Sequence, residues 1–107
     1  MTDRELLELA AKAAGLEFNN KRSTPTTDAL YLGPHSGWWN PLTDDGDALR
    51  LSVKLGIQLL YLDFTAENEA RWSLGNNRIT EYGPDDPYAA ARRAIVRAAA
   101  EIGRNMP

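Results

Sequence analysis

The sequence predicts an α+β domain in which three helices pack on an antiparallel sheet of three to four strands, in the order α-β-α-β-β-β-α. Three segments have apolar residues every three to four positions, each after a side chain that can cap a helix. An apolar run followed by two shorter segments around Gly-Asn-Asn indicates an antiparallel meander. The length of 107 residues suffices for one core, so we assign 1–107 to a single domain.

The first helix is expected at residues 3–14. Thr2 and Glu5 can form a capping box, in which each side chain accepts a hydrogen bond from the backbone N–H of the other residue. Gly15 can adopt the left-handed conformation that ends many helices. The polar segment 17–28 that follows is expected to be a loop.

Two short strands are expected next, at residues 29–32 and at Trp38-Trp39, with a Gly/Pro turn at 33–37 between them. Adjacent side chains of a strand point to opposite faces. One of Trp38 and Trp39 should therefore enter the core, while the other stays nearer the surface as a possible binding residue.

The second helix is expected at residues 44–55, with Thr43 or Asp44 as its cap, because Asn40-Pro41 disfavours helical dihedrals before it. The three aspartates at its start are explained by the favourable interaction of carboxylates with the helix dipole. They lack the spacing of a calcium-binding loop. The predicted apolar stripe consists of Ala48, Leu51 and Leu55, with Leu49 and Val53 beside it.

The segment 57–64 is apolar and aromatic enough for a strand buried on at least one face. The sequence AENE at 66–69 should turn the chain, and strands at 69–74 and 78–82 should then flank the tight turn at 75–77. These segments together predict a three-stranded meander.

Asp86 is expected to cap a long final helix with Pro87 at its first position. Three arginines, Arg92, Arg93 and Arg97, are expected largely off its apolar face, where they would be solvated or available to an acidic partner. The predicted apolar positions are Tyr88, Ala91, Ile95, Ala98 and Ile102.

The composition excludes several functional classes. The chain has no cysteine, so disulfides, zinc–thiolate sites and thiol nucleophiles are absent. The acidic N-terminal segment does not have the pattern of a signal peptide, and no stretch approaches the roughly 18 apolar residues of a membrane span, so we expect a cytoplasmic protein. The net charge of −3 argues against general binding to nucleic-acid backbones.

No catalytic constellation is visible. His35 is the only histidine of the sequence and lies in a Gly/Pro turn, and Ser36 has no base placed near it by a second motif. The segment GPHSG lacks the spacing of a phosphate-binding loop. We therefore expect no enzyme activity, no cofactor and no metal.

Three segments resemble a known family: MTDRELLELAAKAAG, WWNPLTDDGDALRLSVKLGI and DDPYAAARRAIVRAAAEIG. They are similar to the small phage and prophage proteins of the phage α-β-α sandwich domain, a group similar in turn to the Nin-region protein X of lambdoid phages. The Trp-Asn-Pro element before an Asp-led helix and the Ala/Arg-rich last helix carry the resemblance. It implies a fold, a phage origin and the host cytoplasm, and no catalytic residues.

The leading hypothesis is a non-enzymatic accessory protein that binds a host or phage protein, with inhibition of a host defence system as one form of that role. The alternative is a binder of a small ligand or nucleic acid, at the Trp38/Trp39 region or the arginines of the last helix. The family-like segments are accounted for as scaffold, so contacts should concentrate in 17–36 and 58–82. The candidate binding residues are Lys21, Arg22, Tyr31, His35, Trp38, Glu69, Arg71, Arg78 and Tyr82.

Overall fold

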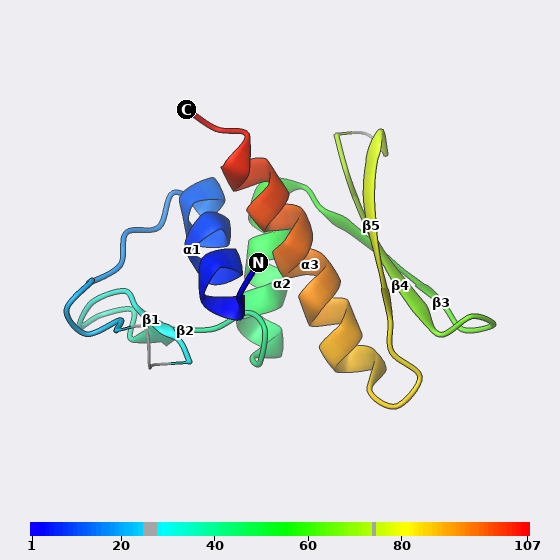
Figure 1. Cartoon of the computed structure of the whole chain (residues 1–107), viewed down its shortest axis with the longest axis horizontal. Helices are drawn as coiled ribbons and strands as arrows, with labels where there is room; N and C mark the ends of the chain where they lie inside the picture. The colour runs from blue at the N-terminus through cyan, green and yellow to red at the C-terminus, as the bar shows by residue number, and fades with distance from the viewer. Residues whose placement is uncertain (25–27, 74) are drawn as a thin grey trace.

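The structure is a computed structural model that describes residues 1–24, 28–73 and 75–107. Within these residues three helices accompany a two-stranded and a three-stranded antiparallel sheet, which confirms the predicted α+β class. In Figure 1 the last helix lies between the first helix and the three-stranded sheet. Part of the predicted loop 17–28 and the last residue of the predicted strand 69–74 lie outside the described residues.

The first helix, α1 (Asp3–Ala14), begins and ends as predicted. The backbone N–H of Glu5 donates to Thr2 Oγ1 at 3.1 Å, and the backbone N–H of Thr2 donates to Glu5 Oε1 at 3.3 Å. Gly15 ends the helix with a φ of 70°. The capping box therefore satisfies two backbone donors at the start of α1.

The second helix, α2 (Asp45–Leu55), is capped by Asp44 rather than Thr43, since Asp44 Oδ2 accepts from the backbone N–H of Asp47 at 2.8 Å. The Asp47 carboxylate in turn accepts from the backbone N–H of Asn40 at 3.0 Å. This bond connects the Trp-Asn-Pro element to the first turn of α2. All three aspartates thus lie at the start of the helix, Asp44 as its cap and Asp45 and Asp47 in its first turn, as the sequence predicted.

The two short strands, β1 (Leu30–Tyr31) and β2 (Trp38–Trp39), form an antiparallel sheet of their own. Leu30 pairs with Trp39, and Tyr31 pairs with Trp38. Trp39 is the inward tryptophan, with 6% of its surface exposed, whereas Trp38 is 47% exposed.

The three-stranded meander consists of β3 (Gln58–Leu62), β4 (Glu67–Trp72) and β5 (Asn77–Tyr82), with β4 in the middle. Ala70, on the face of β4 that meets the last helix, is fully buried. The meander is therefore attached to α3 through its central strand β4 and through β5.

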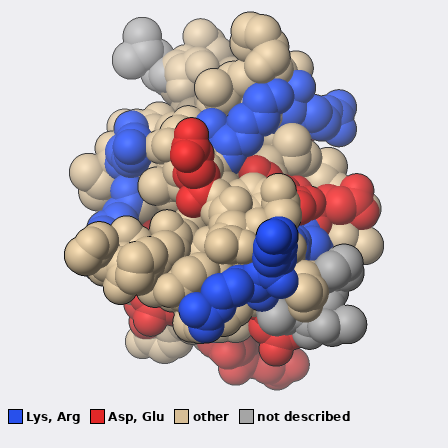
Figure 2. Space-filling model, turned by 90° about the vertical axis from the view of Figure 1, so that its left-hand side faces the viewer, with Lys and Arg blue, Asp and Glu red and all other residues tan. Residues whose placement is uncertain are grey.

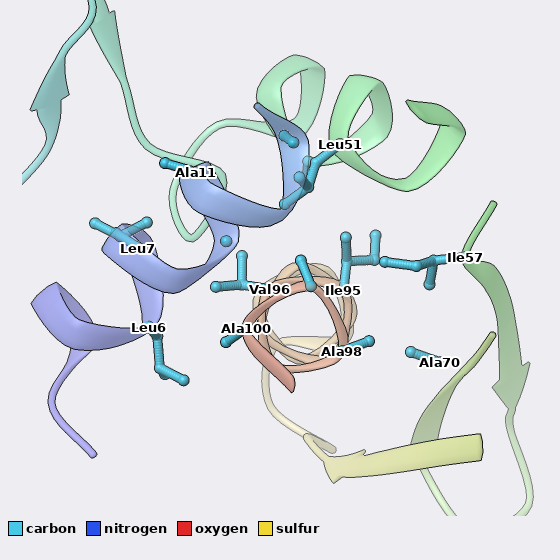
Figure 3. Close-up of a cluster of buried hydrophobic side chains, with 14 of the residues drawn as sticks. Leu6, Leu7, Ala11, Leu51, Ile57, Ala70, Ile95, Val96, Ala98 and Ala100 are labelled. Carbon is cyan, nitrogen blue, oxygen red and sulfur yellow. The ribbon is translucent and has the colours of Figure 1, made fainter. Parts of the chain in front are cut away.

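The last helix, α3 (Pro87–Arg104), is the centre of the core. Asp86 accepts from the backbone N–H of Ala89 at 3.0 Å, which confirms the predicted cap. Figure 3 shows α3 surrounded by side chains from α1, α2 and the meander. The labelled side chains of this core are Leu6, Leu7, Ala11, Leu51, Ile57, Ala70, Ile95, Val96, Ala98 and Ala100.

The contact between α1 and α3 is unusually close at Gly103. A Cβ atom added there would overlap the carbonyl oxygen of Leu9 and lie 3.3 Å from the backbone nitrogen of Ala13. The two helices approach each other through alanines and this glycine, because larger side chains would hold their backbones apart.

The prediction that 57–64 is buried on at least one face is wrong for the strand itself. All five residues of β3 are exposed, and only Ile57, just before the strand, is buried. The reason is that α3 packs on β4 and β5 and scarcely reaches β3, which is the edge of the sheet. Other apolar residues predicted on or beside packed stripes are also exposed: Leu49, Val53 and Tyr88.

The predicted turn at 66–69 is also wrong, because the chain turns at residues 63–66 and β4 begins at Glu67. Ala66 closes this turn with a φ of 55°, a left-handed conformation that alanine seldom adopts. The predicted strand 69–74 consequently lies two residues earlier along the chain, at Glu67–Trp72.

Candidate functional site

Three of the predicted binding residues lie together on the β1–β2 sheet: Arg22, Tyr31 and Trp38. The rings of Tyr31 and Trp38 are 5.1 Å apart between centroids. The guanidinium carbon of Arg22 lies 4.0 Å from the Tyr31 centroid and 5.6 Å from the Trp38 centroid. A cation over an aromatic face at these distances is attracted by the ring quadrupole. We call these three residues the Arg22 stack.

The position of Arg22 follows from the hydrogen bonds of its turn. The Asn19 side chain accepts from the backbone N–H groups of Lys21 and Arg22 at 2.9 and 3.1 Å. The backbone N–H of Asn19 donates to the Tyr31 carbonyl at 2.8 Å, and the Tyr31 N–H donates to Ser23 Oγ at 2.7 Å. Because these bonds connect the turn to β1, the Arg22 side chain is placed over the ring of Tyr31.

Two other predicted residues, Lys21 and His35, are exposed on turns next to the stack. Figure 2 shows the side of the molecule that lies at the left of Figure 1, and there basic and acidic side chains form separate small groups among uncharged ones. This face offers aromatic and cationic groups for stacking, without the broad basic surface that follows a nucleic-acid backbone.

The remaining predicted residues lie on the face of the meander turned away from α3. Glu69 on β4 accepts a hydrogen bond from Arg71 Nε at 2.7 Å and lies 3.5 Å from Arg78 Nη1 on β5. The Glu69 side chain is only 8% exposed, whereas Tyr82 is 70% exposed at the end of β5. The structure therefore joins three of these four residues in one ion cluster, the Glu69 cluster.

The Glu69 cluster holds its carboxylate in the charged form. The hydrogen bond from Arg71 lowers the pKa of Glu69, and the charges of Arg71 and Arg78 lower it further, against the opposing effect of burial. The same bond raises the pKa of Arg71. A carboxylate held this way is a poor proton acceptor, so the cluster stabilises the sheet rather than providing acid–base chemistry.

The arginines of α3, predicted to be solvated or available to a partner, are instead paired within the molecule. In addition to an ion pair, Arg92 makes a hydrogen bond from Nε to the carbonyl of Leu42 at 2.9 Å. These contacts connect α3 to α1, α2 and β5, so the helix presents fewer unpaired cations than its sequence suggested. The ion pairs are Arg92 with Asp45 at 2.7 Å, Arg93 with Asp3 at 3.0 Å and Glu81 at 3.4 Å, and Arg97 with Glu81 at 2.9 Å.

The most conspicuous surface lies within the predicted contact segment 58–82, but none of its residues was among the predicted binding residues. Strand β3 and the turn after it expose five large apolar side chains, which we call the β3 surface: Leu59, Leu60, Tyr61, Leu62 and Phe64. Each residue of this set is at least 40% exposed, and Phe64 is fully exposed. Contiguous exposed apolar residues on a small protein mark an interaction site more often than isolated ones do.

A sequence signal for this surface existed. The run QLLYL is apolar on both faces of a strand, so burying it requires a layer on each side. The chain supplies only one helix directly after the meander, and that helix can cover only one face. The excess of apolar residues over available covering elements therefore indicated an unpartnered strand.

An apolar groove of about 360 Å³ lies beside β3, between this strand, α2 and α3. Leu49 from α2, Leu59 from β3, and Tyr88 and Ile95 from α3 line it. The first three of these side chains are exposed, so the groove continues the β3 surface toward the helices.

Within the described ranges, no group of three or more His, Cys, Asp or Glu residues is arranged to hold a metal ion. None of the helices described here is long and apolar enough to cross a membrane. Comparisons with protein-family models, curated proteins and solved structures found no match to this chain. The resemblance to the phage α-β-α sandwich proteins stays a prediction.

Proposed function

We propose that this chain is a non-enzymatic protein-binding module whose contact site is the β3 surface. One observation supports the proposal above the others: a complete five-residue edge strand whose side chains are apolar or uncharged and all exposed. An uncovered strand of this composition favours a protein partner, because its apolar area gains free energy when another surface removes it from water.

The mode of binding that fits this site is the addition of a partner strand. An edge strand has a row of backbone N–H and C=O groups without partners in its own sheet. A strand added there bonds to these groups, while its side chains contact the apolar residues of β3 on both faces. The exposed groove beside Leu59 adds a place for a larger side chain of the partner.

The partner, on the family resemblance, is a host or phage protein, and interference with a host defence system is the more specific form of this proposal. A catalytic role has little support in the geometry. His35 is exposed in its turn, and the Glu69 carboxylate is bound by two arginines.

The test is capture of partners from a host lysate by the wild-type chain and by two matched variants. Leu60 and Thr80 flank Glu69 in one row of the sheet, on the same face and on opposite edge strands. Leu60→Lys and Thr80→Lys therefore add the same charge beside the same carboxylate. Leu60→Lys should lower capture about tenfold or more, as expected for the centre of an interface, while Thr80→Lys should leave it unchanged.

Both variants must first retain the circular dichroism spectrum and melting temperature of the wild type. Equal capture by the wild type and Leu60→Lys would contradict the assignment of the site to β3. Loss of capture by Thr80→Lys alone would place the site on β5 instead.

A second candidate function rests on the Arg22 stack. Bases of single-stranded nucleic acids stack on aromatic rings and arginines, and the exposed Trp38 beside Arg22 offers such a platform. The net charge of −3 and the ion pairs along α3 weigh against it. Binding of a fluorescent oligonucleotide, lost in Trp38→Ala and retained in Tyr82→Ala, would favour this function over the first.

A further inference from the structure

The two edges of the meander differ in how they are protected. β5 carries Arg78 and Glu81 and packs against α3, and such charges discourage pairing with another strand. β3 has no charged residue between Gln58 and Leu62, and no proline. Proteins usually protect an edge strand with at least one of these devices, so the bare edge of β3 is the exception within its own sheet.

The hydrogen-bond alternation of the sheet shows which residues of β3 face this edge. The backbone N–H of Gly83 donates to the Ala66 carbonyl at 3.0 Å, which makes this the bonded pair that continues the β4–β5 register. Bonded pairs alternate along an antiparallel ladder and switch sides between neighbouring strands. The N–H and C=O groups of Leu59 and Tyr61 therefore point to the open edge.

We propose that the partner of β3 is β3 of a second copy of this chain, paired antiparallel about a twofold axis at Leu60. This inference rests on the protein-binding role of the β3 surface: a second copy occupies the edge in the free protein, and a host or phage partner would pair with β3 by displacing that copy. The two meanders then form one continuous sheet of six strands, with the order β5-β4-β3 in one copy followed by β3-β4-β5 in the other.

The sequence of β3 is complementary to itself in this register. Leu60 lies opposite Leu60 of the second copy, Leu59 opposite Tyr61, and Gln58 opposite Leu62. Each pair is uncharged, and pairs of aromatic and aliphatic side chains stabilise antiparallel strands. The open N–H and C=O groups of Leu59 in one copy meet those of Tyr61 in the other, which completes the ladder at the edge.

Net charge opposes the approach of a second copy, but this register brings no acids face to face. Two molecules of net charge −3 repel each other at long range, so a contact between them needs a surface without opposed acids. With the axis at Leu60, the first acid after the strand, Asp63, lies opposite Ile57 rather than opposite itself. Any shift of the axis leaves fewer of the five strand residues paired.

In the same register, a side chain of the second copy lies beside the groove next to β3. Leu59 and Tyr61 project from the face of β3 that is turned toward α3, since Leu59 pairs with the buried Ala70. Tyr61 of the second copy is then the direct neighbour of Leu59, at the side of the groove lined by Tyr88 and Ile95. Its ring would cover apolar area that the single chain leaves exposed.

A single introduced thiol tests the register. The chain has no cysteine, so Leu60→Cys places one thiol at the twofold axis, and Thr80→Cys places one in the same row on the other edge strand. Opposed residues of an antiparallel pair have Cβ atoms about 4.5–5.5 Å apart, close enough for a disulfide with small adjustment. Under mild oxidant, Leu60→Cys should form a covalent dimer roughly 100-fold faster than Thr80→Cys, because pairing raises the effective concentration of its thiol.

Sedimentation of the purified wild-type chain gives the second measurement. The wild type should be a dimer at micromolar concentration, Leu60→Lys a monomer because two lysines meet at the axis, and Thr80→Lys a dimer. Equal oxidation rates for the two cysteine variants, or a wild-type monomer, would overturn the inference.

These outcomes are separable from those of the proposed function. A monomeric wild type whose capture of another protein is abolished by Leu60→Lys would refute self-pairing and keep the protein-binding role. A Leu60-dependent dimer that captures no other protein would support self-pairing and remove the case for a host partner.

Discussion

Replacement of Gly103 by alanine tests the closest contact of the core. The added Cβ would overlap the Leu9 carbonyl oxygen, lie 3.0 Å from the Leu9 carbonyl carbon and 3.3 Å from the Ala13 nitrogen. All three atoms belong to the α1 backbone, so no side-chain rotation relieves the overlap and α1 must move away from α3. That movement would open the packing around Ala10 and Ala99, which are fully buried.

Two opposing effects set the change in the free energy of unfolding that Gly103→Ala causes. Forcing extra volume into a tight core costs about 1–3 kcal/mol, and more where only backbone can move. Alanine recovers about 1 kcal/mol of helix propensity relative to glycine. With the first effect at or above the top of its range, we expect Gly103→Ala to lower the free energy of unfolding by about 2–3 kcal/mol, or the melting temperature by about 10–15 °C.

Gly46 provides the matched control, because it also lies in a helix. An added Cβ there would meet Arg50 Nη1 and Asp44 Oδ2, each at 3.2 Å. The end of the Arg50 side chain can move away, and the bond from Asp47 to the capping Asp44 Oδ2, now 2.8 Å, has to lengthen by only a few tenths of an ångström. Gly46→Ala should therefore be neutral or stabilise by up to about 1 kcal/mol. Urea unfolding followed by tryptophan fluorescence measures both variants. A Gly103→Ala midpoint equal to or above that of the wild type would refute the proposed α1–α3 contact.

Further predictions concern the core and the Glu69 cluster. Trp39 and Ile95 are each 6% exposed, so Trp39→Ala and Ile95→Ala should each lower the free energy of unfolding by about 2–5 kcal/mol. Trp38→Ala should lower it by about 1 kcal/mol or less, because Trp38 is half exposed. Equal urea midpoints for the two tryptophan variants would contradict this difference. Arg71 lowers the pKa of Glu69 in the folded state. The contribution of the Glu69 carboxylate to stability is therefore fully present above its unfolded-state pKa, and it is lost as the pH falls through its folded-state pKa. Glu69→Gln should therefore flatten the dependence of stability on pH below about 4.5. Acid titration of the wild type and of Glu69→Gln, followed by circular dichroism, measures this dependence. The same slope in the two proteins would show that Glu69 does not contribute.

The helices were predictable because their limits depend on neighbours in sequence. Thr2 with Glu5, and Asp86 before Pro87, act within one turn, so their effect does not depend on the rest of the fold. The turn between β3 and β4 was not predictable in the same way. Its closing residue, Ala66, has a left-handed backbone that its residue type does not indicate.

The burial of β3 and the make-up of the candidate site depend on distant contacts. The apolar run of β3, followed by a single helix after the meander, indicates that one face of the strand stays open. Which residues are left exposed depends on where α3 crosses the sheet, and that crossing is set by contacts far away in the sequence. Arg22 reaches Tyr31 because Asn19 and Ser23 both bond to the backbone of Tyr31, which follows Ser23 by eight residues. Gly103 gave no clear signal either, because a glycine one residue before the end of a helix is usually explained as part of the helix end.

The central position of α3 has a consequence for how the molecule is made. Its arginines reach across nearly the whole chain, as in the bond from Arg93 to Asp3, 90 residues apart. Such long-range contacts slow folding, because the intervening chain must be ordered before they form. During synthesis α1 and the meander leave the ribosome before α3 does. They therefore lack a shared core until α3, which packs against both, has been translated. During that interval the apolar residues of β3 are exposed without the rest of the core, so this strand is the part of the nascent chain most exposed to aggregation.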